Sequence, residues 1–151
     1  MDEGASLPPL TVTAIDGTPI RLTDLPLPAV IYFYPKDDTS GCTREAQDFS
    51  ALSESFAAAG TSLLGISRDS PASHGKFVAK HALTVTLASD EDGSVCEAFG
   101  VWGEKQMYGR TYMGIERATF LFGADGRLVR AWRKVKVPGH AQAVLDAVHA
   151  L

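Results

Sequence analysis

The sequence predicts an α/β domain with a mixed central sheet and helices on both faces of that sheet. A continuous apolar run at residues 29–34, rich in β-branched and aromatic residues, stops at Pro35, as a strand buried on both faces does. A helical pattern and a second buried run at 61–67 follow, and this β-α-β order implies a right-handed parallel crossover. A later hairpin within 119–132 adds antiparallel strands to the same sheet.

The N-terminal part is expected to supply a hairpin at the sheet edge and the crossover helix. Two short apolar runs, 10–13 and 20–22, flank an Asp-Gly turn signal and are predicted to pair as strands. In the crossover helix, apolar residues recur every three or four positions from Ala46 to Phe56, and Gly60 closes the helix.

The second half continues the alternation of strands and helices. Pro71 opens a helix that extends to about Lys80, because proline is tolerated in a first helical turn. A short strand at 85–87 and a small helix around 95–99 follow, and the segment 100–114, which carries several turn signals, is interpreted as a loop. The remaining expected elements are the hairpin strands 119–122 and 128–132 and a helix from near Pro138 that carries Val144, Leu145 and Val148 on one face.

Length and composition indicate one domain over residues 1–151. We find no internal repeat, low-complexity tract or linker, and a chain of this length can hold its own core. The net charge of −4 argues against a nucleic-acid or anionic-membrane partner. No apolar stretch approaches a membrane span, and the acidic start lacks the features of a secretory signal. With two cysteines in 151 residues, a cytoplasmic protein is expected.

Cys42 is the residue on which the functional prediction rests. The segment 35–45 joins the central strand to its crossover helix, and ligands bind at this carboxyl end of strands in open α/β sheets. Thr39 or Ser40 is a natural N-cap, which places Cys42 in the first helical turn. There the positive end of the helix dipole and free backbone N–H groups favour the reactive thiolate.

Acidity alone cannot make such a thiol a fast catalyst. An ordinary thiol of pKa about 8.5 is roughly 3% ionised at pH 7, so full ionisation gains only about thirtyfold. Nucleophilicity falls as the pKa falls, which removes about tenfold of that gain for a two-unit shift. The rest must come from groups that align the substrate with sulfur and stabilise the charge of the leaving group, such as a fixed cation, a hydroxyl and backbone N–H groups.

The pattern Pro35…Thr39…Cys42, with Glu45 three positions further on, resembles the active-site signature of the peroxiredoxins. Longer strings are similar to the Q subfamily of that family, also called the bacterioferritin comigratory proteins. The similarity spans nearly the whole chain, and the strings that carry it are 32–39, 41–43, 100–105, 108–109 and 114–120.

This resemblance implies a thioredoxin-like fold with an N-terminal β-hairpin. It also implies a thiol-dependent peroxidase that reduces hydrogen peroxide and organic hydroperoxides. The enzyme would be monomeric and would use no metal or organic cofactor. The resemblance implies that Cys42 is the peroxidatic nucleophile, which becomes a sulfenic acid. It also implies that Thr39 hydrogen-bonds the peroxide and that Arg117 stabilises the thiolate and contacts the substrate. Pro35 would shield the pocket from water, and Glu45 would hold arginine side chains in place.

The second, resolving cysteine of many relatives is missing at its usual places, which here hold Gln47 and Val78. Cys96 is the other thiol, 54 residues after Cys42. The favoured interpretation makes Cys96 a buried small hydrophobe. An outside thiol, such as thioredoxin, glutaredoxin or a low-molecular-weight thiol, then reduces a sulfenic acid that is prone to further oxidation. The alternative is a disulfide between Cys42 and Cys96 after local unfolding, which needs Cα atoms within about 7 Å.

Several other residues are expected to have no part in the chemistry. Trp102 is interpreted as a packing residue in preference to a wall of the pocket, and Tyr34 as a core residue. Asp37 and Asp38 are interpreted as a solvated loop face. The histidines show no spacing typical of a metal site or a Cys–His pair, and all of them are expected to be structural or solvated: His74, His81, His140 and His149.

Other functions compete with the peroxidase. A dithiol–disulfide oxidoreductase needs a second cysteine three positions from the first, but Thr39 and Glu45 occupy both of those places. A Cys–His hydrolase lacks a histidine in the expected site loops. A non-enzymatic redox sensor that uses Cys42 stays open, because sensing and peroxidation begin with the same sulfenic acid; multiple turnovers distinguish the peroxidase.

Overall fold

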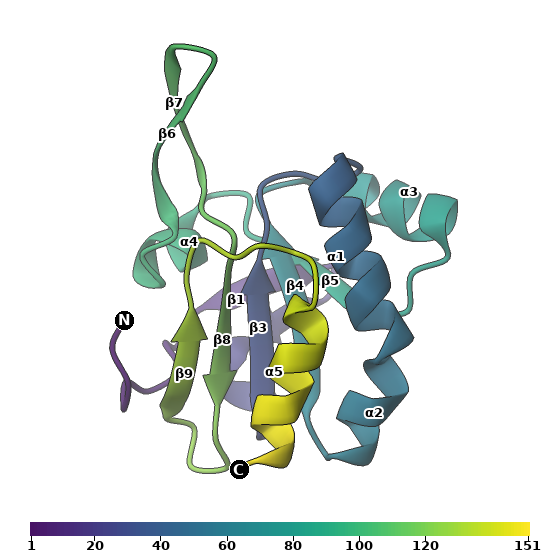
Figure 1. The fold of residues 1–151 in the computed structure, drawn as a ribbon, viewed down its shortest axis with the longest axis vertical. Coiled ribbons are helices and arrows are strands. Elements are labelled where there is room, and N and C mark those ends of the chain that lie inside the picture. The colour runs from purple at the N-terminus through teal and green to yellow at the C-terminus, as the bar shows by residue number, and fades with distance from the viewer.

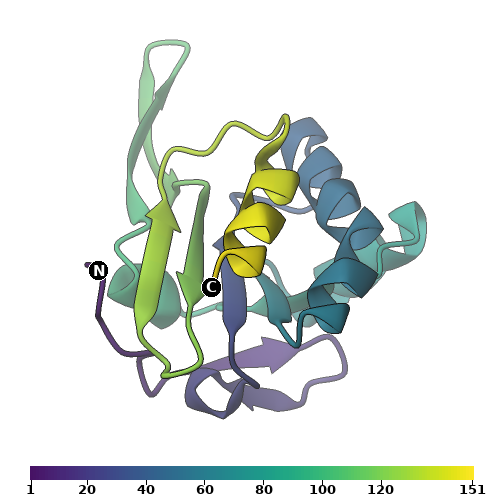
Figure 2. The same ribbon diagram turned by 60° about the horizontal axis from the view of Figure 1, so that its bottom comes forward.

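The protein is built on a seven-stranded mixed sheet, which we describe from a computed structural model that covers residues 1–151. The strand order is β2-β1-β5-β4-β3-β8-β9, with parallel pairing of β3 with β4 and of β4 with β5, and antiparallel pairing elsewhere. The strands are β1 (Thr11–Ala14), β2 (Pro19–Arg21), β3 (Ala29–Phe33), β4 (Ser62–Ser67), β5 (Thr86–Ser89), β8 (Ala118–Phe122) and β9 (Leu128–Trp132). The predicted mixed sheet and its edge hairpin, β1–β2, are confirmed (Figures 1 and 2).

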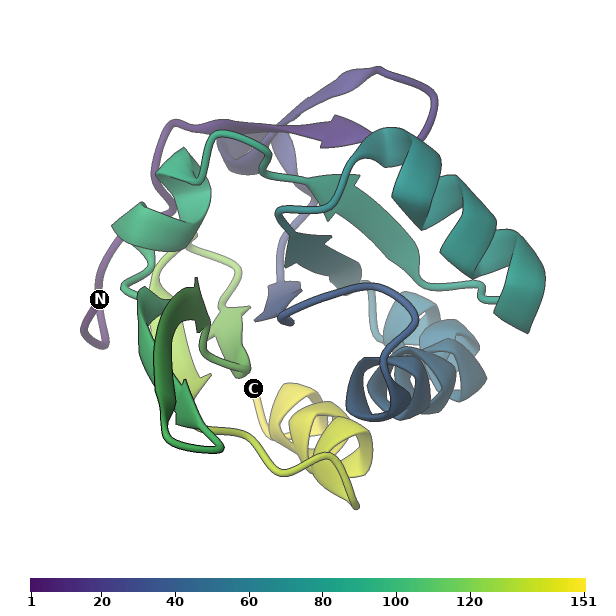
Figure 3. The same ribbon diagram turned by 90° about the horizontal axis from the view of Figure 1, so that it is seen from above.

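Helices cover both faces of this sheet, as the sequence predicts. They are α1 (Ser40–Ala51), α2 (Ser53–Ala58), α3 (Pro71–His81), α4 (Ser94–Ala98) and α5 (His140–His149), with a short 3₁₀ helix at Leu22–Asp24. Figure 3 shows α1, α2 and α5 together on one side of the sheet and α4 on the other. None of the helices has the length and apolar character needed to cross a membrane.

The sheet separates two hydrophobic cores. All five residues of β3 are buried, and their side chains alternate between the faces as the period of a strand requires. Val30 and Tyr32 join the core that holds Cys42 and packs under α1, α2, α3 and α5. Ile31 joins the opposite core, which holds Cys96 and packs under α4. The two cysteines therefore lie in different cores.

One expectation, a loop over residues 100–114, is wrong. There the chain forms a two-stranded antiparallel hairpin, β6 (Trp102–Met107) and β7 (Arg110–Ile115), which projects from the sheet (Figure 1). Its turn residues Tyr108 and Gly109 both have positive φ, 53° and 75°, as a type I′ hairpin turn requires. Most of the hairpin is exposed, so it lacks the alternation of apolar and polar residues by which strands are predicted from sequence.

The crossover helix is also less regular than expected. The apolar spacing predicts a continuous helix through Phe56, but α1 ends at Ala51 and α2 begins at Ser53. Leu52, between the two, has φ −101° and ψ 3°, outside helical geometry. The Ser53 hydroxyl donates to the Ser50 carbonyl at 2.8 Å, which satisfies one of the carbonyl groups freed by the break.

Candidate active site

Cys42 lies in the first turn of α1, at the carboxyl end of β3, as the sequence predicts. Thr39 is the N-cap residue, with extended backbone angles of −90° and 156°. Its side chain does not cap the helix; instead the hydroxyl donates to the Lys36 carbonyl at 2.9 Å. The N–H groups at the start of α1 therefore have no side-chain acceptor, and the positive end of the helix dipole acts on Cys42, the third residue of the helix.

Arg117 links Cys42 to Glu45. Its Nη2 donates to Cys42 Sγ at 3.3 Å, and its Nη1 donates to Glu45 Oε1 at 2.7 Å. Arg117 stands between β7 and β8, 75 residues from Cys42, so the contact depends on how the strands pack. Gly41 makes room for the guanidinium, because a Cβ at this position would lie 3.1 Å from Arg117 Nη2.

The charges of this cluster are coupled. Burial raises the pKa of Glu45 to about 7, although Arg117 acts in the opposite direction. Burial disfavours the charged form of Arg117, but Glu45 and Cys42 more than offset it, so the pKa of the guanidinium is raised. Glu45 is buried and its Oε2 has no hydrogen-bond partner, so the carboxylate relies on Arg117 alone for its neutralisation.

Cys42 lines a cavity of about 640 Å³ while exposing only 2% of its surface. Pro35, Thr39 and Arg117 line the same cavity, so the structure brings these predicted site residues together, with Glu45 bonded to Arg117. Apart from Trp102, considered as a pocket wall but not favoured, the far wall is not predicted from the sequence, because it comes from the hairpin that was expected to be a loop. It consists of Trp102, Lys105, Met107, Tyr112, Met113, Gly114 and Ile115. Trp102 thus lines the cavity in addition to packing against the core.

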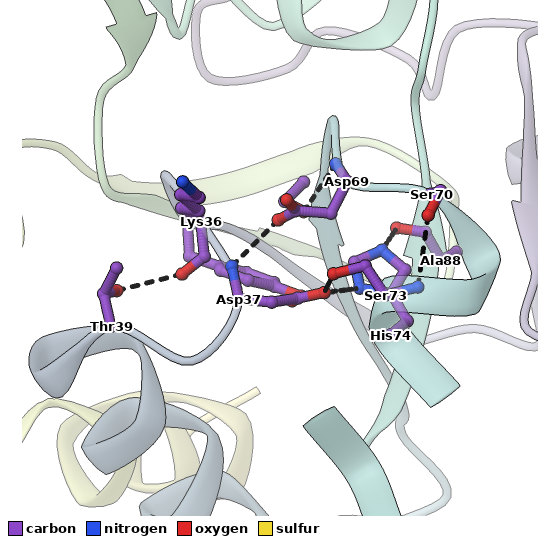
Figure 4. A network of polar contacts seen from close by, with 10 residues as sticks. Lys36, Asp37, Thr39, Asp69, Ser70, Ser73, His74 and Ala88 are labelled. Atoms are coloured by element: carbon purple, nitrogen blue, oxygen red, sulfur yellow. Dashed lines mark hydrogen bonds and ion pairs between the residues drawn. The ribbon is translucent and has the colours of Figure 1, made fainter. Parts of the chain in front are cut away.

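Asp37 is buried, and the expectation that it is solvated is wrong. Tyr34 Oη donates to Asp37 Oδ1 at 2.6 Å, and Ser73 Oγ donates to Oδ2 at 2.8 Å. His74 Nδ1 lies 2.8 Å from Oδ2, while its Nε2 faces the Ala88 carbonyl at 3.0 Å (Figure 4). Because each ring nitrogen faces an oxygen atom, the His74 ring is held between the loop before α1 and β5.

This network fixes the loop before Cys42 to α3. Burial alone would raise the pKa of Asp37, but hydrogen bonds from His74, Tyr34 and Ser73 outweigh it and lower that pKa. The neighbouring residue Asp38 has a left-handed φ of 58°, and its carboxylate is exposed as expected. The local pattern of two adjacent acidic residues could not distinguish them, since α3, which buries Asp37, is distant in sequence.

Cys96 lies in the opposite core and is fully buried. The Asp90 carboxylate accepts hydrogen bonds from the backbone N–H groups of Val95 at 3.2 Å and of Cys96 at 2.8 Å. Burial, followed by the nearby Asp90, raises the pKa of the Cys96 thiol well above its ordinary value. The sheet stands between this thiol and Cys42, and both cysteines are free.

Comparison with known proteins agrees with this geometry. The model of the AhpC/TSA family matches residues 4–131. Peroxiredoxin Bcp of Xanthomonas campestris is 56% identical over 121 residues, 80% of this chain and 76% of that protein. Peroxiredoxin Bcp of Bacillus subtilis is 44% identical over 146 residues, 96% of this chain and 93% of that protein.

Solved structures lead to the same family. The bacterioferritin comigratory protein of Xanthomonas campestris superposes with a TM-score of 0.90 at 48% identity, over 99% of this chain and 98% of that one. Peroxidoxin BcpB from Mycobacterium tuberculosis superposes with a TM-score of 0.87 at 31% identity, over 100% of this chain and 98% of that one. The chain therefore belongs to the AhpC/TSA family and is a thiol-dependent peroxidase of the Bcp, or Q, type of peroxiredoxin.

Proposed function

We propose that this peroxidase reduces hydrogen peroxide and organic hydroperoxides through the Cys42 thiolate and that an outside thiol regenerates it. The observation that carries the proposal is the 3.3 Å contact between Arg117 Nη2 and Cys42 Sγ. A guanidinium beside the sulfur favours the thiolate, and it can stabilise the negative charge that develops on a departing oxygen.

In the proposed reaction the thiolate attacks the hydroxyl oxygen of the hydroperoxide. A sulfur–oxygen bond forms, the oxygen–oxygen bond breaks, and the departing alkoxide or hydroxide takes up a proton to become an alcohol or water. Cys42 is left as a sulfenic acid. Arg117 stabilises negative charge on the sulfur before attack and on the departing oxygen after it, and Glu45 holds the guanidinium in position through its 2.7 Å contact.

Thr39 and Pro35 complete the proposed site. The Thr39 hydroxyl gives its hydrogen to the Lys36 carbonyl, so toward the cavity it presents lone pairs that can accept the hydrogen of the peroxide. Pro35 lines the cavity without offering a backbone N–H, which limits competing hydrogen bonds with water near the sulfur.

Organic hydroperoxides fit the size and lining of the cavity. Apolar side chains of the hairpin, Met107, Tyr112 and Met113, face the same space as Cys42 and can contact an alkyl group. The Xanthomonas campestris bacterioferritin comigratory protein has been characterised structurally for alkyl peroxide reduction, which supports the same substrate class here.

A one-cysteine cycle is supported by the place of Cys96. Its sulfur lies beyond the sheet from Cys42, and its amide is tied to Asp90. A disulfide between the two cysteines would require local unfolding of both α4 and the start of α1. Gln47 and Val78 offer no sulfur in its place.

Intact-mass spectrometry after one equivalent of hydrogen peroxide tests this cycle. We expect one added oxygen on Cys42, and after addition of thiol a mixed disulfide followed by many turnovers. A chain that loses two hydrogens would establish a Cys42–Cys96 disulfide and refute the one-cysteine cycle. If the chain is oxidised once and neither a small thiol nor thioredoxin supports further turnover, the protein would be a sensor instead.

A further inference from the structure

The cavity over Cys42 is strongly cationic, although the protein is acidic overall. Four of its 14 lining residues are Lys36, Arg68, Lys105 and Arg117, and no aspartate or glutamate is among them. The chain as a whole has a net charge of −4. Positive charge gathered along one partly enclosed space attracts anions into it.

Three of these cations have no carboxylate partner. Lys36, Arg68 and Lys105 form no ion pair, whereas other cations of the surface, such as Lys80 and Arg133, do. Arg68 instead contacts neutral groups: it donates to the Glu91 backbone carbonyl at 3.1 Å and lies 4.5 Å over the Trp102 ring. Its charge is therefore left available to an anion in the cavity.

Lys105 is held at the cavity in the same way. Its Nζ donates to the Ile115 carbonyl at 2.6 Å. Burial and the adjacent Arg117 charge lower the pKa of Lys105, so an anion placed between the two cations would relieve their repulsion. Among the four cations only Arg117 has an acidic partner, Glu45.

The cavity is larger than hydrogen peroxide alone requires. A volume of about 640 Å³ lies within the range of small-molecule sites. Hydrogen peroxide has only two heavy atoms and needs roughly twice the 30 Å³ of a water molecule. Reduction of the sulfenic acid follows departure of the alcohol or water, so the same space can then hold a small reductant whose reactive atom reaches Cys42.

In the folded state, Cys42 is more accessible to a small reductant than to a protein. The cysteine is 2% exposed and faces the cavity, so a thiol carried on a folded protein reaches it only if the start of α1 moves. A small thiol can enter the cavity with the fold intact.

We propose that the outside thiol is a low-molecular-weight thiol that carries one or more carboxylates, bound by Lys36, Arg68 and Lys105. This inference rests on the proposed one-cysteine cycle and names its reductant. The thiol's sulfur attacks the sulfur of the Cys42 sulfenic acid; a disulfide bond forms, the S–O bond breaks, and hydroxide leaves and takes the thiol's proton as water. A second thiol then displaces the Cys42 thiolate and releases a small disulfide and one proton, so two thiols are oxidised for each sulfenic acid reduced.

Quenched-flow mass spectrometry in two stages tests the proposal. One equivalent of hydrogen peroxide first converts Cys42 to its sulfenic acid, and the mixed disulfide is then followed with mercaptosuccinate, an acidic thiol, and with 2-mercaptoethanol, a neutral one. The ratio of the two rates is compared between proteins, which cancels the intrinsic reactivity of each thiol. Failure to form the sulfenic acid would count against the proposed function; failure of the second stage alone counts against this inference.

Lys36→Gln and Arg68→Gln should each lower the mercaptosuccinate to 2-mercaptoethanol ratio, by up to about fivefold for a unit charge near 4 Å in water. Added salt should lower the wild-type ratio in the same direction. Lys76→Gln, which removes an exposed charge from α3 outside the cavity, is the matched control and should leave the ratio unchanged. Lys36 is exposed and its side chain has no partner, so Lys36→Gln should fold normally. The test therefore stays valid even if Arg68→Gln misfolds. Equal ratios in all four proteins, or reduction by thioredoxin but not by mercaptosuccinate, would overturn the proposal.

Discussion

The two cysteines occupy the same local position in their helices but lie beside opposite charges. Each is the third residue of a helix, Cys42 in α1 and Cys96 in α4, and each is buried, at 2% and 0% exposure. A rule based on helix position and burial would treat them alike. They differ in what their surroundings supply to the sulfur.

At α4, the Asp90 carboxylate takes the free N–H groups and places negative charge beside the thiol, which keeps its proton. At α1, no side chain takes these groups, and Arg117 brings positive charge to 3.3 Å. The two helix starts therefore surround their sulfurs with opposite charge, positive at Cys42 and negative at Cys96.

The largest expected effect tests the comparison directly. Cys42→Ser should abolish peroxide turnover, because serine offers no thiolate at neutral pH, whereas Cys96→Ser should retain it to within about twofold. Steady-state turnover with hydrogen peroxide and mercaptosuccinate measures both. Substantial loss in Cys96→Ser, with the fold intact by circular dichroism, would give Cys96 a part in the cycle.

The second largest effect on activity is expected when the positive charge beside Cys42 is removed. Arg117→Met is expected to slow sulfenic acid formation by about 100- to 1,000-fold, the usual cost of losing one donor to a developing oxyanion. Single-turnover oxidation by hydrogen peroxide measures the rate. Arg44→Met, which removes an exposed arginine from the same helix, is the control and should stay near wild type. Similar rates in both variants would contradict the role given to Arg117.

Loss of the buried Asp37 network, which fixes the loop before Cys42, should lower both stability and activity. Asp37→Ala leaves His74, Tyr34 and Ser73 without their acceptor and should cost about 3 kcal/mol in free energy of unfolding. It should also slow peroxide reduction. Urea denaturation gives the first value. The adjacent exposed residue provides the control, since Asp38→Ala breaks only surface pairs and should lose much less.

For Glu45, the prediction concerns pH. Its pKa of about 7 means that the folded chain keeps a proton that the unfolded chain has lost above about pH 4.5. The folded state then binds more protons, so the Glu45 contribution to the free energy of unfolding falls as pH rises from about 4.5 to 7, by on the order of 2 kcal/mol. Denaturation at pH 5 and pH 7.5 should show this decline in the wild type and a flatter profile in Glu45→Gln. Parallel profiles would disprove it.

The smallest effect is expected where Asp90 caps α4. Asp90→Ala removes the acceptor of two backbone N–H groups and should cost about 1–2 kcal/mol in free energy of unfolding. The matched change Asp92→Ala removes an exposed acceptor of the Ser94 amide and should cost less. Urea denaturation compares them, and equal losses would mean that burial of the Asp90 cap adds nothing.

Local patterns in the sequence were enough for most of the fold. The apolar run of β3 and the turn signals around β1–β2 and β8–β9 depend only on neighbouring residues, and the structure confirms each of these elements. The hairpin β6–β7 was missed, because most of its residues are exposed and the strands carry no apolar period.

Part of the site could also be predicted from neighbouring residues alone. The place of Cys42 in a first helical turn follows from the residues that surround it, whereas the part given to Arg117 came from resemblance to a family. Asp37 was misjudged, because nothing near it in sequence reveals that His74, 37 positions away, packs against it.

The sequence by itself determined the mixed sheet, the helix start that carries Cys42, and the peroxiredoxin family, since strand period, capping and motif are short-range properties. Only the tertiary structure decided which charges meet each thiol. Arg117 lies 75 residues from Cys42, the cationic cavity is closed by a hairpin from a separate sheet, and the two cysteines are divided by the central sheet. Such contacts depend on packing between distant segments, which sets the electrostatic surroundings of each sulfur.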